Sequence, residues 1–191
     1  MTTTLPTPAP AATRPRTGAR AGTRAGAAAL VAAGISVAVG VTQLLHPQDT
    51  DPAIEPRTAA ILVGTAVMLW ALPVLHLHLA ALAGTRWPAI AASTGTVLLS
   101  GGMLSSVVNG EDLAFFPAVA LVANALWFLG SVALAVGLWR SGRVSRPLVA
   151  LLPLVTPVFL FLSQTGGGVP VGAYLAVVGW LLLRGQLDRR A

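Results

Sequence analysis

The chain has 191 residues, of which 55% are hydrophobic and only 9% are charged. Average globular chains are about one quarter charged, so this composition leaves too little polar surface for a domain in water and predicts a membrane protein. The sequence contains neither cysteine nor lysine, and its twelve basic residues are all arginine. Thiolate chemistry, zinc–thiolate sites, iron–sulfur clusters, lysine Schiff bases and lysine-containing phosphate loops are therefore excluded.

Residues 1–24 are rich in Thr, Pro, Ala, Gly and Arg and show no apolar periodicity. This composition predicts a disordered basic arm on the cytoplasmic side, whose arginines lie close to anionic lipid headgroups. The arm is long and lacks a twin-arginine pair, and the apolar run that follows it is long enough to cross a membrane. We therefore expect that run to be an uncleaved signal-anchor rather than a secretory signal.

Six apolar runs without Asp, Glu, Lys or Arg follow the arm. Crossing a hydrocarbon core of about 30 Å takes about 20 residues of helix, and the first four runs meet this length. The last two runs have 17 and 15 residues, so either their boundaries near Gly166 shift or the turn between them sinks into the membrane. We predict an all-α, polytopic bundle of six transmembrane helices over residues 25–183, followed by a cytoplasmic tail at 184–191. The runs are Ala25–Leu45, Thr58–Leu82, Ala89–Val108, Pro117–Trp139, Pro147–Ser163 and Val169–Leu183.

The arginines mark one side of the predicted bundle. Eleven of the twelve precede the first run, follow the last run, or lie in the connections after the second and fourth runs. The positive-inside rule therefore places both termini in the cytoplasm, which requires an even number of spans. Because the arginines follow the ends of the runs and form no single basic face, we expect no nucleic-acid partner. The opposite connections hold Arg57 with the acidic residues Asp49, Asp51, Glu55, Glu111 and Asp112.

Small side chains form stripes on the first and last runs, and we interpret them as packing seams rather than catalytic groups. Proline predicts a bend at Pro73 in the second run and at Pro153 and Pro157 in the fifth. The stripes consist of Ala29, Ala33, Ser36, Gly40 and Gln43 on the first run and Gly172, Ala176 and Gly179 on the last.

The three histidines do not suit a metal or haem site. His76 and His78 are two residues apart on a helix and point to nearly opposite sides, while His46 lies across the membrane from them. We expect His76 and His78 to lie near the inner interface, with a proton relay as the alternative. No acidic residue or arginine lies within a run, which argues against a proton- or sodium-driven carrier. We expect no metal and no cofactor.

Polar and aromatic residues gather toward the outer half of the predicted bundle. Asn124 is the strongest signal, because an amide within a membrane helix needs a hydrogen-bond partner. If the helical faces converge, they line an apolar, aromatic pocket for a hydrophobic small molecule; the alternative is an aromatic belt with solvated loops. Gln43 and His46, at the end of the first run, lie in the same outer half of the bundle as Asn124. The candidate substrate-binding residues are Trp70, Asn109, Phe115, Phe116, Asn124, Trp127 and Tyr174.

The connection at residues 109–117 has a pattern of its own. Gly110 suits the end of the third run, and Pro117 suits the first turn of the fourth. Phe115 and Phe116 would then dip into the membrane interface. A carboxylate beside these rings would lose solvent, hold its proton more tightly and serve as a general acid. The candidate catalytic residues are Glu111, Asp112 and His46, with a solvated, inert role as the alternative for His46.

An acid beside an apolar cavity lined by Trp and Phe is what a protonation-initiated isoprenoid cyclisation requires. In size, helix number and this layout the chain resembles the small membrane-bound terpene cyclases of bacterial and fungal natural-product pathways. The resemblance implies a prenylated substrate, with membrane lipids as the other partner. The Leu44-Leu45-His46-Pro47 step and the lysine-free composition also look like those of small actinobacterial membrane proteins. A non-catalytic membrane subunit or scaffold, and a passive transporter or pore for a neutral solute, are the alternatives.

Overall fold

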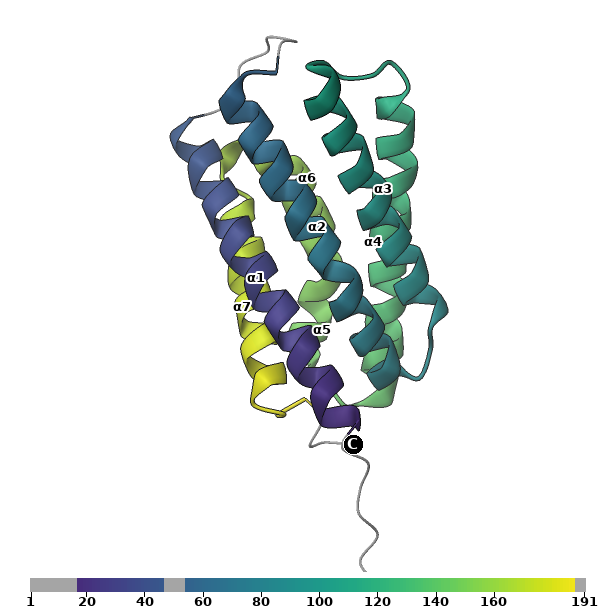
Figure 1. Ribbon diagram of the computed structural model, residues 1–191. Coiled ribbons are helices and arrows are strands. Elements are labelled where there is room, and N and C mark those ends of the chain that lie inside the picture. Colours follow the sequence, from purple (N-terminus) through teal and green to yellow (C-terminus); the bar gives the residue numbers. More distant parts are fainter. Residues whose placement is uncertain (1–16, 47–53, 188–191) are drawn as a thin grey trace, which may run out of the picture.

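The computed structural model describes residues 17–46 and 54–187, and this part of the chain is helical, with no strand. The helices stand side by side along one axis, and α1 begins at the end of the bundle where α7 ends (Figure 1). The elements are α1 (Thr17–Leu45), α2 (Pro56–Ala83), α3 (Trp87–Asn109), α4 (Phe116–Ser141), α5 (Arg146–Leu151), η1 (Leu152–Leu154), α6 (Val155–Phe161), η2 (Ser163–Thr165) and α7 (Gly168–Leu183).

Four of these helices, α1 to α4, are long and apolar enough to cross a membrane, which indicates a membrane protein. Two further apolar segments are shorter. The α5–η1–α6 segment spans Arg146–Phe161 and α7 spans Gly168–Leu183, each below the length that a straight helix needs to cross a full hydrocarbon core.

The start of α1 corrects the predicted boundary of the N-terminal arm. The helix begins at Thr17 rather than Ala25, so the last eight residues of the predicted disordered arm are helical. Alanine and arginine are strong helix formers, and the helix therefore continues past the point where the apolar run stops. The rest of the predicted arm, residues 1–16, and the end of the predicted tail, residues 188–191, lie outside the described residues.

The helices follow one another around the bundle in the order α7, α1, α2, α3, α4, with the α5–η1–α6 segment against α4 and α7. The seam between α1 and α7 confirms the predicted packing of small residues. The Ser36 hydroxyl donates a hydrogen bond to the Gly168 carbonyl at 2.8 Å. A Cβ at Gly172 would lie 2.8 Å from the Ala33 carbonyl oxygen, so a larger residue would push the two backbones apart.

Proline breaks the fifth apolar run but leaves the second run as one helix, because α2 continues through Pro73. Pro153 has no N–H to donate to the preceding turn, and the chain there tightens into η1. The Leu152 N–H bonds the Val149 carbonyl, which leaves the Leu148 carbonyl without its usual helical donor. The Tyr174 hydroxyl of α7 donates to that carbonyl at 3.1 Å, so a neighbouring helix restores the missing bond.

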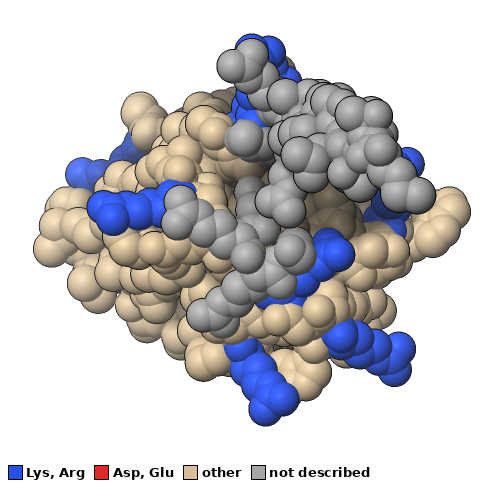
Figure 2. All heavy atoms as spheres, turned by 90° about the horizontal axis from the view of Figure 1, so that it is seen from below, with Lys and Arg blue, Asp and Glu red and all other residues tan. Residues whose placement is uncertain are grey.

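The charged residues separate to the two ends of the bundle. The end at which α1 begins and α7 ends carries arginine, and Figure 2 shows blue spheres there and no red ones among the atoms described. Arg57, Glu55, Glu111 and Asp112 lie at the other end, next to the starts of α2 and α4. There the Ile54 N–H donates to the Gly110 carbonyl at 3.2 Å and ties the two connections together.

Candidate functional site

A cavity of about 170 Å³ lies between the helices in the half of the bundle nearer the acidic end. We call it the Trp127 cavity. Side chains from α1, α2, α3, α4, α6 and η2 form its wall, so it is a product of the tertiary fold rather than of any one helix. They are Gln43, Ile61, Leu62, Thr65, Leu99, Met103, Asn124, Trp127, Phe159, Leu160 and Ser163.

The cavity combines an apolar wall with a few hydrogen-bonding groups. Gln43, near the end of α1, is 6% exposed and contributes its side-chain amide. The amide nitrogen of Asn124 donates to the Ala120 carbonyl of its own helix at 2.8 Å. The partner predicted for Asn124 is thus its own backbone, and its amide oxygen is left as an acceptor. An amide donor and an amide acceptor can fix the orientation of one polar group on a bound molecule.

Trp127 is the most deeply enclosed aromatic residue of the cavity wall, and it packs against Phe159. Its side chain is 1% exposed, and its ring lies 6.1 Å from the ring of Phe159 at an angle of 59°. Tilted aromatic pairs at this separation are energetically favourable. Gly95 of α3 allows α4 to approach closely, because a Cβ there would lie 2.6 Å from the backbone nitrogen of Trp127. The position of this ring therefore depends on close contact between α3 and α4.

The predicted proton donors lie outside this cavity. Glu111 and Asp112 are exposed at the connection before α4, and neither lines the cavity wall. Asp112 accepts a hydrogen bond from the buried Ser106 hydroxyl at 2.6 Å, which fastens the connection to the end of α3. His46 is exposed after α1, and Asn109 is exposed with its amide bound to the Ser105 carbonyl at 2.7 Å. The structure therefore does not bring these four residues together with Trp127.

The other predicted aromatic residues point elsewhere. Trp70 is 59% exposed and Phe115 is 60% exposed, which corrects the expectation that they line the same pocket as Trp127. Phe116 is half-buried, and its ring lies against Gly102 of α3. Of the seven predicted substrate-binding residues, the structure brings together Asn124 and Trp127, and Gln43 joins them as expected from its level.

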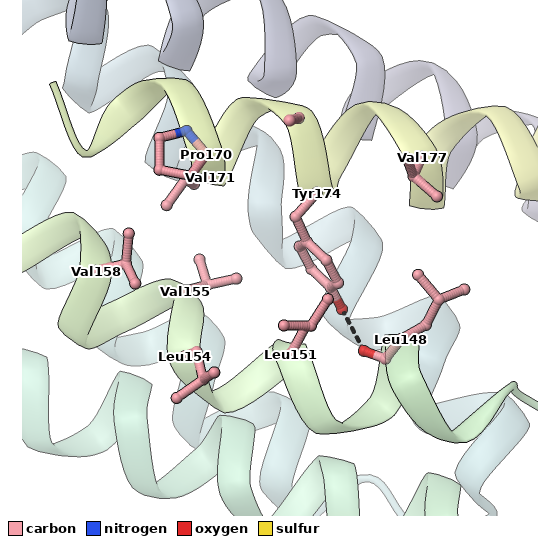
Figure 3. A pocket seen from close by; sticks show the side chains of 10 residues that line it. Leu148, Leu151, Leu154, Val155, Val158, Pro170, Val171, Tyr174 and Val177 are labelled. Carbon is pink, nitrogen blue, oxygen red and sulfur yellow. Dashed lines mark hydrogen bonds between the residues drawn. The ribbon is translucent and has the colours of Figure 1, made fainter.

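Tyr174 lines a different groove, on the surface between α7 and the α5–η1–α6 segment. Figure 3 shows its ring crossing from α7 toward Leu148, among aliphatic side chains from both sides. This groove has a volume of about 490 Å³, and Tyr174 is the one hydrogen-bonding side chain among its lining residues. Because the Tyr174 hydroxyl already bonds the Leu148 carbonyl, its observed role is to join the two segments.

His76 and His78 lie on α2, and His46 follows α1. No group of three or more His, Cys, Asp or Glu side chains that could hold a metal occurs among the residues described. His76 is buried between helices, and its Nδ1 lies 3.5 Å from the Ser93 hydroxyl oxygen of α3. His76 lies further along α2 than the cavity residues Ile61 and Thr65, and neither His76 nor Ser93 lines the cavity.

Sequence analysis missed most of the cavity wall. Ile61 and Thr65 on α2, and Leu99 and Met103 on α3, lie four residues apart on single helical faces. This spacing is the signal that could have found them. It is weak in this chain, because the lipid-facing sides of the helices are as apolar as the sides that face inward.

Comparisons with protein-family models, with curated proteins and with solved structures gave no match to this chain.

Proposed function

We propose that this protein is a six-span membrane protein, with both termini in the cytoplasm, that binds a small apolar molecule carrying one hydrogen-bonding group. The Trp127 cavity is the observation that carries the binding proposal. The arginine-rich end supports the orientation, because positive charge collects on the cytoplasmic side of membrane proteins. Support for six spans comes from α7 and the α5–η1–α6 segment, which run alongside the four long helices (Figure 1).

The size of the cavity limits the ligand. Sites for drug-sized molecules usually have volumes of about 300–1,000 Å³, whereas an apolar cavity of about 150 Å³ holds benzene. At about 170 Å³, the Trp127 cavity suits a molecule with a single ring or a short branched chain. A farnesyl or geranylgeranyl chain would fit only if most of it extended beyond the cavity.

Cyclisation would need a proton donor in addition to this binding site. No carboxylate lines the Trp127 cavity among the residues described, and Asp112 is engaged by Ser106. The geometry therefore supports binding better than acid catalysis. Offering farnesylated substrates to the purified protein tests the cyclase hypothesis directly. If cyclic products form and the Glu111→Gln/Asp112→Asn variant abolishes them, the acid assignment holds and a binding function alone is insufficient.

Binding is tested with fluorine-labelled probes on the purified full chain. We expect 4-fluorophenol to show saturation-transfer signals in ¹⁹F NMR and to bind more tightly than fluorobenzene, because the Gln43 amide bonds its hydroxyl. One hydrogen bond is worth about 1 kcal/mol, so Gln43→Leu should weaken 4-fluorophenol about five-fold and leave fluorobenzene unchanged. Gln186→Leu is the matched control, since Gln186 is exposed beyond α7.

Two results would overturn the binding proposal. In the first, 4-fluorophenol binds no more tightly than fluorobenzene to the wild-type chain, and Gln43→Leu leaves the affinity of both probes unchanged. The other is unchanged binding to Met103→Phe, which adds ring volume to the cavity wall.

A further inference from the structure

A groove of about 310 Å³ lies between α4 and the first turns of the α5–η1–α6 segment. We call it the α4–α5 groove. It is separate from the Trp127 cavity and from the groove around Tyr174. Val132, Val136, Trp139 and Arg140 of α4 line one side, and Val149 and Ala150 of α5 line the other. The groove is thus aliphatic along most of its length and ends at an arginine and a tryptophan.

Two arginines flank the end of the groove. Arg140 forms part of its lining, and the guanidinium carbon of Arg146 lies 5.5 Å from the centre of the Trp139 ring. Both arginines are exposed at the end of the bundle where Figure 2 shows arginine and no acidic side chain among the described atoms. With no described carboxylate at this end to pair with them, both guanidinium groups can bind an anion.

We propose that the α4–α5 groove binds one anionic glycerophospholipid, with an acyl chain between α4 and α5 and the phosphate on Arg140 and Arg146. Guanidinium groups form strong charge-assisted hydrogen bonds with phosphate oxygens. Tryptophan favours the depth at which headgroups meet acyl chains, so Trp139 sets the level of the glycerol. Basic pockets between membrane helices on the cytoplasmic side are suited to anionic headgroups. The inference rests on the proposed placement of α5 in the membrane.

The lining of the groove favours an anionic lipid over an uncharged apolar partner, because its apolar side chains end at Arg140 and Arg146. The larger groove around Tyr174 lacks a charged residue in its lining, so it offers no headgroup site. Of these two grooves, the α4–α5 groove combines an apolar channel with cationic groups at its end.

The lipid site is tested by native mass spectrometry of the full chain in detergent, titrated with phosphatidylglycerol or phosphatidylcholine of equal chain length. We expect one phosphatidylglycerol to be retained in preference to phosphatidylcholine. An arginine near a lipid phosphate contributes about a five-fold gain in affinity, so Arg140→Gln with Arg146→Gln should weaken retention about 25-fold. Arg184→Gln is the matched control, because Arg184 also stacks on a tryptophan, 4.6 Å from the Trp180 ring, but lies outside the groove.

A second pair of measurements tests the acyl chain. Ala150→Phe places a ring in the groove from an exposed position and should displace the chain, with a loss of retention of at least five-fold. Dihexanoyl phosphatidylglycerol, which carries the same headgroup on short chains, should not compete with the long-chain lipid. Equal retention of the two headgroups, an equal loss in Arg184→Gln, or full competition by the short-chain lipid would each overturn the proposal.

Labelling of a single cysteine separates this proposal from that of six spans. The chain has no cysteine, so Ala150→Cys provides one reactive site in the groove. Protection of this cysteine from a membrane-impermeant maleimide in liposomes supports the placement of α5. Rapid labelling would refute that placement and the lipid site with it, whereas protection together with equal retention of both lipids would refute the lipid site alone.

Discussion

Gly95 is the position at which helix packing and the Trp127 cavity depend most directly on each other. A Cβ at Gly95 would lie 2.6 Å from the backbone nitrogen of Trp127 and 3.0 Å from its Cβ, and would also meet the Ala123 carbonyl oxygen. Ordinary contact begins at 3.4 Å, and the Ala123 carbonyl oxygen is the closest of these atoms, so in Gly95→Ala α4 must move away from α3 by about 1 Å. Backbone atoms cannot rotate aside as a flexible side chain can, so this shift would also move the turn that carries Trp127.

Overpacking of this kind costs about 1–3 kcal/mol. We therefore expect Gly95→Ala to lower the free energy of unfolding by that amount and to weaken 4-fluorophenol binding. Gly101→Ala is the matched control on the same helix, because a Cβ at Gly101 has no neighbouring atom within 4 Å. This control also measures the gain of up to about 1 kcal/mol that alanine brings in helix propensity. The comparison thus isolates the contact between the two helices.

The assay is reversible unfolding of the full chain in mixed micelles by increasing SDS, followed by circular dichroism, with probe binding measured on the same samples. Equal unfolding of Gly95→Ala and Gly101→Ala would refute the argument that α3 and α4 are held at this distance by the missing Cβ. If Gly95→Ala lowers the stability but leaves 4-fluorophenol binding unchanged, then binding does not depend on the distance between α3 and α4.

Two further predictions concern hydrogen bonds between helices, and a third concerns the orientation of the chain. Tyr174→Phe removes the donor to the Leu148 carbonyl and should cost about 1 kcal/mol in the same unfolding assay, and an unchanged midpoint would show that the bond is dispensable. Ser36→Ala at the α1–α7 seam should cost about 0.6 kcal/mol, the average for a hydrogen bond between membrane helices, and a loss above about 2 kcal/mol would mean that packing is also damaged. The orientation is tested by labelling single cysteines with an impermeant maleimide in inverted and right-side-out vesicles. We expect Ala114→Cys to react from the external side and Gln186→Cys to react from the cytoplasmic side. Labelling of both cysteines from the same side would refute an even number of spans.

The positions of the long helices could be predicted from the sequence almost completely. The predicted ends of the second, third and fourth runs lie within two residues of the ends of α2, α3 and α4. This agreement has a physical cause. Lipid requires an uninterrupted apolar stretch of about 20 residues, so the charges that flank each stretch mark the points where the chain leaves the membrane.

The start of α1 and the break in the fifth run show where this criterion fails. An apolar run identifies the part of a helix that lies in lipid, whereas the helix itself continues through Arg20 and Arg24. Pro153 signals a break, but the sequence does not show that Tyr174, 21 residues further on, supplies the lost hydrogen bond. That partner follows from the placement of α7 beside α5, which is a property of the whole bundle.

The candidate site was predictable only through its polar members. Asn124 and Gln43 stand out because amides are rare in apolar helices, and both line the cavity. Trp70 and Trp127 could not be distinguished in the same way. Both are aromatic residues near the middle of apolar helices, yet one faces outward and the other is enclosed. In a water-soluble protein the outward face of a helix is polar, so the sequence distinguishes it from the apolar inward face. In lipid both faces are apolar, and the sequence no longer distinguishes them.

The union of α1 with α7 has a consequence for the synthesis of this protein. Ser36 and Gly168 are separated by 132 residues. At about 5–20 residues per second, a ribosome needs roughly 7 to 26 seconds to make the chain between them. During that interval α1 lacks the counterpart of its small-residue face, so lipid tails must cover that face once α1 is in the bilayer. Closure of the bundle therefore waits for the final helix.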